Sequence, residues 1–140
     1  MKVIIRTSWA LVLLFILSSV SAFAFAPGEE YLFDSLKKPA YRASWNAMFK
    51  GEKNVPAWLA NFAKTYNGPT SPCKPLNIDG VEYKVHSVCK AHDCAANMFI
   101  VFFAPEGRKA WGVLFTSSQR FFGHPDQKMK SALVRAKDCN

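Results

Sequence analysis

The stretch "NMFIVFFA" (residues 97–104) is an almost unbroken apolar run of strand length. A strand that is buried on both faces has this composition, because neither of its faces meets water. We therefore expect a central strand here. The segment "PEG" (residues 105–107) predicts a turn, and "RKAWGVLFTS" (residues 108–117) predicts the strand that returns beside the first.

Upstream of this run, "LNIDGVEYKVHSV" (residues 76–88) alternates with period two around Asp79-Gly80. An Asp-Gly pair between two alternating stretches is a strong β-hairpin signal. In the second arm the apolar residues share one face, and the charged residues share the other face with His86. The alternation therefore predicts that His86 is an ordinary side chain on the solvent side of its strand.

Helical spacing of apolar residues predicts helices over residues 39–51, 56–68 and 124–137, and a short apolar pattern covers residues 30–38. The breaker-rich "GPTSPCKP" (residues 68–75) predicts a loop. Together these segments predict an α+β domain: an antiparallel β-meander of about four to five strands with helices packed on it. On this reading "CKAHDC" (residues 89–94) is a protruding hairpin tip between the second and third strands of the meander.

The N-terminus has the three parts of a secretory signal peptide. Lys2 and Arg6 precede an apolar run over residues 9–20, and small residues follow over residues 21–26. We predict that residues 1–26 are a signal peptide, which exports the chain from the cytoplasm. The apolar run is shorter than the ~20 residues that span a bilayer, so no membrane span is expected, although an uncleaved anchor is the alternative.

Cleavage after Ala24 or Ala26 fits the small-residue rule equally well, and residues 27–140 then form a single domain. The net charge of +8 becomes +6 when Lys2 and Arg6 are removed (8 − 2 = 6). The remaining cations are dispersed, with no run of five like charges, so the charge pattern does not predict a nucleic-acid partner.

Four cysteines in an exported domain of this size predict two disulfides. Proximity favours a bond between Cys89 and Cys94, which leaves Cys73 to pair with Cys139. The first bond closes too little chain to stabilise the whole domain, so we expect its effect to be on local shape.

The residues of "CKAHDC" could in principle serve metal binding, nucleophilic catalysis or recognition. Oxidised cysteines bind no zinc, and a cysteine nucleophile needs a free thiolate beside a base in a pocket. No cofactor motif accompanies them. We therefore expect no enzyme activity, metal or cofactor. A covalently closed ring suits recognition, because little conformational entropy is lost when it enters a partner's cleft. The alternative is a merely structural, stapled turn.

"CKAHDC" resembles the signature loop of the Ivy family, the periplasmic inhibitors of vertebrate (c-type) lysozyme, in which the loop is typically C-K-P-H-D-C. Further similar segments are "PAWL" (residues 56–59), "GVEYKVHSVCKAHDC" (residues 80–94), "WGVLFT" (residues 111–116) and "FGHPDQKMKSAL" (residues 122–133). Ala91 departs from the family's usual proline. The pair Cys73 and Cys139 is not carried by every member.

The resemblance implies a c-type lysozyme as the protein partner, with the disulfide-closed loop inserted in its active-site cleft. Cys89 and Cys94 would close the ring, and His92 would reach between the catalytic glutamate and aspartate. Lys90, Ala91 and Asp93 would shape the tip. The competing hypothesis is an exported peptidoglycan-associated binding module or a small envelope enzyme whose disulfide loop is only structural. A homodimer remains open, since nothing in these residues decides the oligomeric state.

Overall fold

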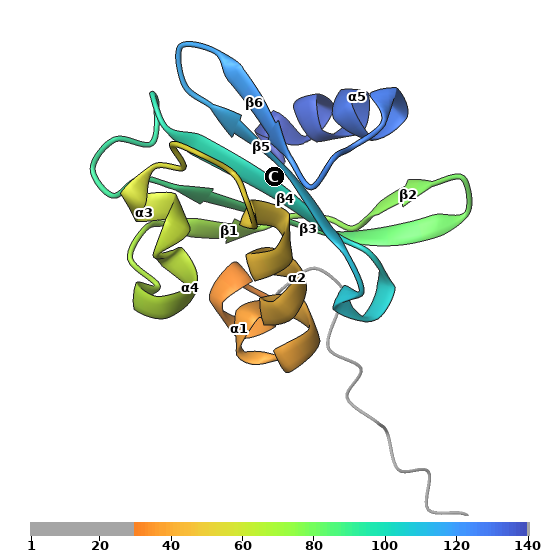
Figure 1. The fold of residues 1–140 in the computed structure, drawn as a ribbon. Helices are drawn as coiled ribbons and strands as arrows, with labels where there is room; N and C mark the ends of the chain where they lie inside the picture. The colour runs from red at the N-terminus through yellow and green to blue at the C-terminus, as the bar shows by residue number, and fades with distance from the viewer. Residues whose placement is uncertain (1–29, 140) are drawn as a thin grey trace, which may run out of the picture.

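The apolar run forms β4 (Met98–Phe103) in the middle of an antiparallel sheet, as predicted (Figure 1). It pairs along its whole length with β3 (Val81–Cys89) on one side and β5 (Ala110–Phe115) on the other. The side chains of Phe99, Val101 and Phe103 enter one core cluster, whereas Ile100 and Phe102 enter a second. The central strand is therefore buried on both faces of the sheet.

The computed structural model describes residues 30–139. The predicted signal peptide and its two cleavage sites lie outside the described residues. Of the helices that the structure describes, none has the length and apolar character needed to cross a membrane.

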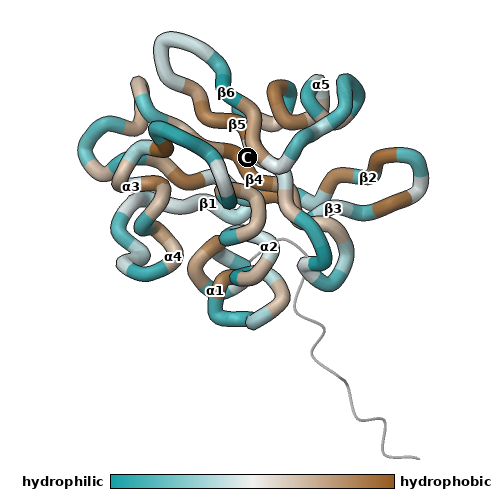
Figure 2. Tube along the Cα trace, in the orientation of Figure 1, coloured by the Kyte–Doolittle hydropathy of each residue, from teal (hydrophilic) through white to brown (hydrophobic). Residues whose placement is uncertain are grey.

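One face of the sheet is covered by four helices (Figure 1). They are α1 (Leu32–Lys37), α2 (Pro39–Phe49), α3 (Ala57–Ala60) and α4 (Phe62–Thr65). Their apolar side chains form the first cluster with alternate residues of the central strands, and Figure 2 shows how hydrophobic residues concentrate along those strands. Burial of this apolar stripe is the main stabilising contribution to each helix, because helices this short are marginal alone.

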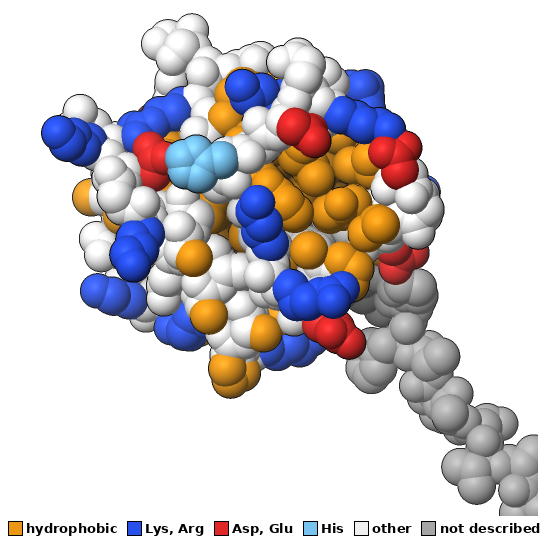
Figure 3. Space-filling model, turned by 45° about the vertical axis from the view of Figure 1, so that its right-hand side comes forward, with side chains coloured by type: hydrophobic (Ala, Val, Ile, Leu, Met, Phe, Trp, Pro, Cys, Tyr) orange, Lys and Arg blue, Asp and Glu red, His pale blue; other side chains and the backbone are white. Residues whose placement is uncertain are grey.

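The opposite face is covered by α5 (Gln127–Arg135), which continues into η2 (Ala136–Asp138). Asp126 caps α5, since its carboxylate accepts a hydrogen bond from Met129 N at 2.8 Å. The Cys73–Cys139 disulfide ties the end of the chain to this side. Beyond α5 the sheet remains partly open, and Figure 3 shows hydrophobic side chains gathered there with charged side chains around them.

Six strands form the sheet, in the order β1-β3-β4-β5-β6 with β2 also pairing β3. The hairpin of β2 (Leu76–Ile78) and β3 and the turn η1 (Pro105–Gly107) lie where they were predicted. Two edge strands were missed: β1 (Thr70–Pro72), inside the predicted loop, and β6 (Gln119–Phe122). Strands this short take their conformation from their partner strand, so they carry little signal of their own.

The helix predicted over residues 56–68 is two short helices that meet at Asn61. The second ends at Thr65, and the next residue, Tyr66, has a φ of 50° in the left-handed region, so the helix stops before Gly68. The predicted pattern of apolar residues was correct, because Leu59 and Phe62 are both fully buried.

The prediction that His86 faces solvent is wrong. His86 is only 1% exposed, and its Nε2 lies 3.0 Å from the hydroxyl oxygen of Ser35 in α1. Burial lowers the pKa of His86 to about 4, and the positive charge of Lys84 adds to this effect. The alternation correctly placed His86 on the less apolar face of β3. It could not show that helices would cover this face of the sheet.

Because His86 is neutral in the folded state, we expect stability to fall in mild acid. The unfolded chain takes up a proton near pH 6.5, whereas the folded chain does so only near pH 4. Stability should therefore be complete above pH 6.5 and fall by about 3 kcal/mol as the pH drops to 4. Urea unfolding across this range measures the effect. His86→Gln should flatten the pH dependence, and an unchanged slope in that variant would contradict this explanation.

Candidate functional site

The residues of the predicted inhibitory loop, Cys89 to Cys94, lie together at one end of the sheet, where β3 turns into β4. The two strands pair up to Cys89 and Met98, and the β3–β4 loop (residues 90–97) extends beyond the strands at the left of Figure 1. A disulfide joins Cys89 to Cys94 across a Cα–Cα distance of 4.8 Å. Cys89 is buried at the end of its strand, whereas Lys90 and His92 are exposed. The ring is thus anchored in the sheet and presented to solvent.

The base of the ring is held by the segment that leads into β1. Cys89 N donates a hydrogen bond to the carbonyl oxygen of Pro69 at 3.0 Å. Gly68 has a φ of 143°, and a Cβ at that position would lie 2.5 Å from the carbonyl oxygen of Cys89. Only glycine permits this close backbone approach. The neighbouring chain therefore restrains the ring at its root.

The tip of the β3–β4 loop is a tight turn over residues 90–93. Asp93 N donates to the carbonyl oxygen of Lys90 at 3.0 Å, and His92 has a φ of 63°. Ala91 is not among the residues with positive φ. A negative φ followed by a positive φ is the pattern of a type II turn, in which the second residue is often proline. The turn places His92 at its third position, exposed to solvent.

The inside of the loop contains a hydrogen-bonded contact that the sequence did not reveal. Asp93 Oδ2 accepts from Asn97 Nδ2 at 2.8 Å and from Lys90 Nζ at 3.3 Å. Asp93, which was expected to shape the tip, also makes contacts within the loop: Oδ2 takes part in both, and its side chain is 40% exposed. Asn97 was predicted as the first residue of the central strand, whereas β4 begins at Met98 and Asn97 belongs to the loop.

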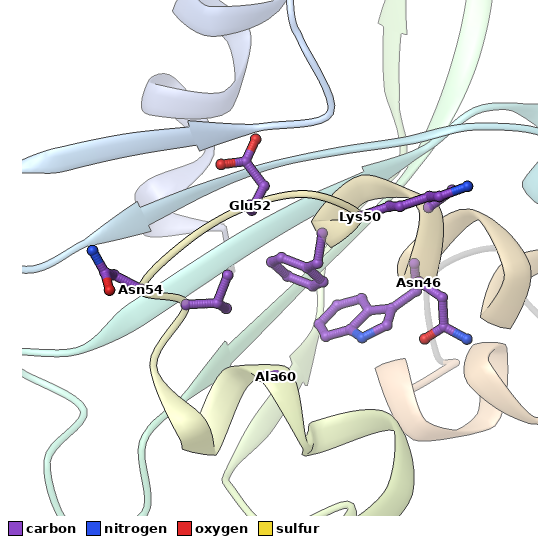
Figure 4. Close-up of a pocket in the computed structure, with 9 residues that line it drawn as sticks. Asn46, Lys50, Glu52, Asn54 and Ala60 are labelled. Carbon is purple, nitrogen blue, oxygen red and sulfur yellow. The ribbon is translucent and has the colours of Figure 1, made fainter.

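Away from the loop, a hollow of about 760 Å³ lies between the end of α2 and α3, and Figure 4 shows the residues that line it. The one carboxylate that lines it, Glu52, is 2.9 Å from the guanidinium of Arg120. No histidine, cysteine or serine is among the lining residues. The polar residues that line the hollow are Asn46, Lys50, Glu52 and Asn54.

His124 is exposed just before α5, with a φ of 53°. Within residues 30–139, no three His, Cys, Asp or Glu side chains are grouped so that they could hold a metal ion. Among the described residues, the strongest candidate for a recognition site is therefore the exposed imidazole of His92 in the loop that the disulfide closes.

Comparison with known proteins identifies the family of the chain. The family model described as "Inhibitor of vertebrate lysozyme (Ivy)" matches residues 40–135, which include the whole β3–β4 loop. The chain belongs to the Ivy family. A Pseudomonas aeruginosa relative named "Inhibitor of vertebrate lysozyme" is 33% identical over 125 residues, with 79% of each chain covered. An uncharacterised protein of Yersinia pestis is 36% identical over 85 residues, which are 61% of this chain and 53% of that protein.

The turn geometry explains why proline is usual at position 91 in the Ivy family. Proline fixes φ near −65°, the value that the second position of a type II turn needs. The backbone N–H of Ala91 takes part in no hydrogen bond with the described residues, so replacing it would break none. The turn of this chain therefore forms with alanine at a position where proline would pre-set φ.

We expect Ala91→Pro to stabilise the protein by about 0.4–1 kcal/mol, because the substitution restricts the unfolded chain without straining the turn. Urea unfolding of the oxidised protein measures the change. Ala91→Gly is the matched control and should destabilise by a similar amount. Destabilisation by the proline would mean that the turn has a different geometry.

Proposed function

We propose that this chain is an exported, periplasmic inhibitor of c-type lysozyme whose β3–β4 loop blocks the enzyme's active-site cleft. The observation that carries the proposal is the exposed His92 at the tip of a disulfide-closed loop, in a member of the Ivy family. The name of the Pseudomonas aeruginosa relative supports the same partner. The proposal assigns the recognition role to residues 89–94.

Lysozyme chemistry explains why an imidazole would be effective. A retaining glycosidase of this type uses one protonated and one ionised carboxyl group on either side of the scissile bond. An imidazole has two ring nitrogens on opposite edges, so it can form hydrogen bonds with two groups at once. His92 placed between the carboxyl groups would occupy the substrate's position and engage both catalytic groups. No bond is made or broken, so the inhibitor needs no catalytic machinery of its own.

The shape of the loop also suits insertion into a cleft. The Cys89–Cys94 bond closes the loop, and the contact of Cys89 with Pro69 fixes its base. A segment that is already ordered loses little conformational entropy on binding, which leaves more of the contact energy for affinity. Lys90 and Ala91 would complete the surface of the tip beside His92.

Replacing the imidazole should weaken inhibition strongly. We expect His92→Ala to cost about 1.5–3 kcal/mol of binding, roughly one to two decades in the inhibition constant, because a charge-assisted hydrogen bond is lost. His124→Ala is a matched control, since this exposed histidine also has a positive φ and its substitution costs similar backbone strain. Titration of purified c-type lysozyme with each variant measures the effect. Equal loss in both variants, or none in the first, would contradict the proposed role of His92.

Opening the ring should weaken inhibition without unfolding the domain. In Cys89→Ala with Cys94→Ala, we expect slower or weaker binding while the circular dichroism of the sheet persists, because the short closed loop contributes mainly local rigidity. The control removes the other disulfide, with Cys73→Ala and Cys139→Ala. That change should lower the free energy of unfolding by about 4 kcal/mol yet leave inhibition by the folded protein intact. Full potency of the opened ring would show that closure is not needed.

The competing hypothesis is a peptidoglycan-binding module or envelope enzyme. The same titration tests it, together with assays of pelleting with peptidoglycan and of peptidoglycan hydrolysis by the purified chain. A lysozyme inhibitor abolishes turnover near equal molar amounts and does not hydrolyse peptidoglycan itself. A wall-binding protein would instead pellet with peptidoglycan and leave lysozyme unbound. That second result, or hydrolysis by the purified chain, would overturn the proposal.

A further inference from the structure

The disulfide closes the ring between residues 89 and 94, but the β3–β4 loop continues to Asn97 before β4 begins. Asn97 bonds to both ends of the turn that carries His92. Its carbonyl oxygen accepts from Lys90 N at 3.0 Å, and its N–H donates to the carbonyl oxygen of Asp93 at 3.1 Å. The backbone of Asn97 thus spans the open side of the loop.

The side chain of Asn97 adds a third hydrogen bond, which is also to Asp93. Its amide donates to Asp93 Oδ2 at 2.8 Å, a bond to a charged acceptor. Lys90 Nζ approaches the same oxygen at 3.3 Å from the other end of the turn. Hydrogen bonds to a carboxylate are shorter and stronger than those between neutral groups. The Asp93 carboxylate is therefore the centre of a brace, formed by Lys90, Asp93 and Asn97, inside the loop.

This brace restrains the backbone on both sides of His92. The imidazole is exposed and stands on a left-handed residue, a backbone conformation that is costly for any side chain with a Cβ. Such a residue keeps its conformation only when the neighbouring backbone is held firmly. Asn97 is hydrogen-bonded to Asp93, the residue after His92, and to Lys90, the first residue of the turn.

We infer that Asn97 is a positioning residue for His92: its side-chain amide holds Asp93, and the brace keeps the imidazole directed outward for the partner. The inference rests on the proposed function and extends it to a residue outside the ring. Asp93 then acts within the loop, because its Oδ2 receives both of these hydrogen bonds.

The test is inhibition of c-type lysozyme by Asn97→Ala, alone and combined with His92→Ala. We expect the single substitution to weaken inhibition about fivefold, the factor that corresponds to one net hydrogen bond. In the His92→Ala background it should have almost no further effect, because a positioning residue acts only through the group it positions. Asn46→Ala, an exposed asparagine in the middle of α2, is the control and should inhibit as the wild type does.

An exchange of the two side chains provides a rescue. Asn97→Asp alone places a second carboxylate beside Asp93 and should weaken inhibition more than Asn97→Ala does. Adding Asp93→Asn restores one amide and one carboxylate in the opposite order, and should recover most of the lost inhibition. Hydrogen exchange of the free protein gives a readout without lysozyme: the amide of Asp93 should exchange faster in Asn97→Ala, while amides of β4 should not change.

The outcomes separate this inference from the proposed function. If His92→Ala weakens inhibition but Asn97→Ala does not, the inference is wrong and the role of His92 stands. If the two effects add in full, Asn97 contacts the partner itself and is not a positioning residue. If His92→Ala has no effect, the proposed mechanism fails, and unchanged exchange at Asp93 would show that the brace is absent too.

Discussion

The burial of β4 on both faces is the constraint on which the rest of the structure depends. A shift of one residue in its register would move Phe99 and Phe103 out of one core cluster and Ile100 out of the other. The pairing with β3 is therefore strongly specified, and with it the position of Cys89 opposite Met98. The site lies where this pairing ends, so the packing of the core determines where the loop leaves the sheet.

The site is a projection, and its stability comes from several independent restraints. A disulfide closes the ring, the segment before β1 holds its base, and Asn97 spans its open side. Each restraint reduces the number of conformations that the tip can adopt before binding. A convex, pre-ordered site suits recognition of a cleft on another protein, whereas catalysis would need a concave site with converging groups.

Local chemistry explains which elements could be predicted. The β2–β3 hairpin was identified because Asp79 and Gly80 can adopt positive φ, and both do. The strand at residues 98–103 and the helix at residues 39–49 have strong patterns of their own. The edge strands β1 and β6 were missed because their conformation comes from pairing with β3 and β5. The break at Asn61 was missed because the apolar spacing continues across it.

The sequence by itself determined the α+β class, the central strand, the hairpin and the family, because these depend on residue types that are close together in the chain. It also placed His92 in a short segment between two cysteines. Only the tertiary structure decided the environment of His86, whose partner Ser35 is 51 residues away, and the hydrogen bonds of Asn97 within the loop. Burial and hydrogen-bond geometry depend on how distant segments pack and on the exact path of a turn, and no local pattern of residues records either.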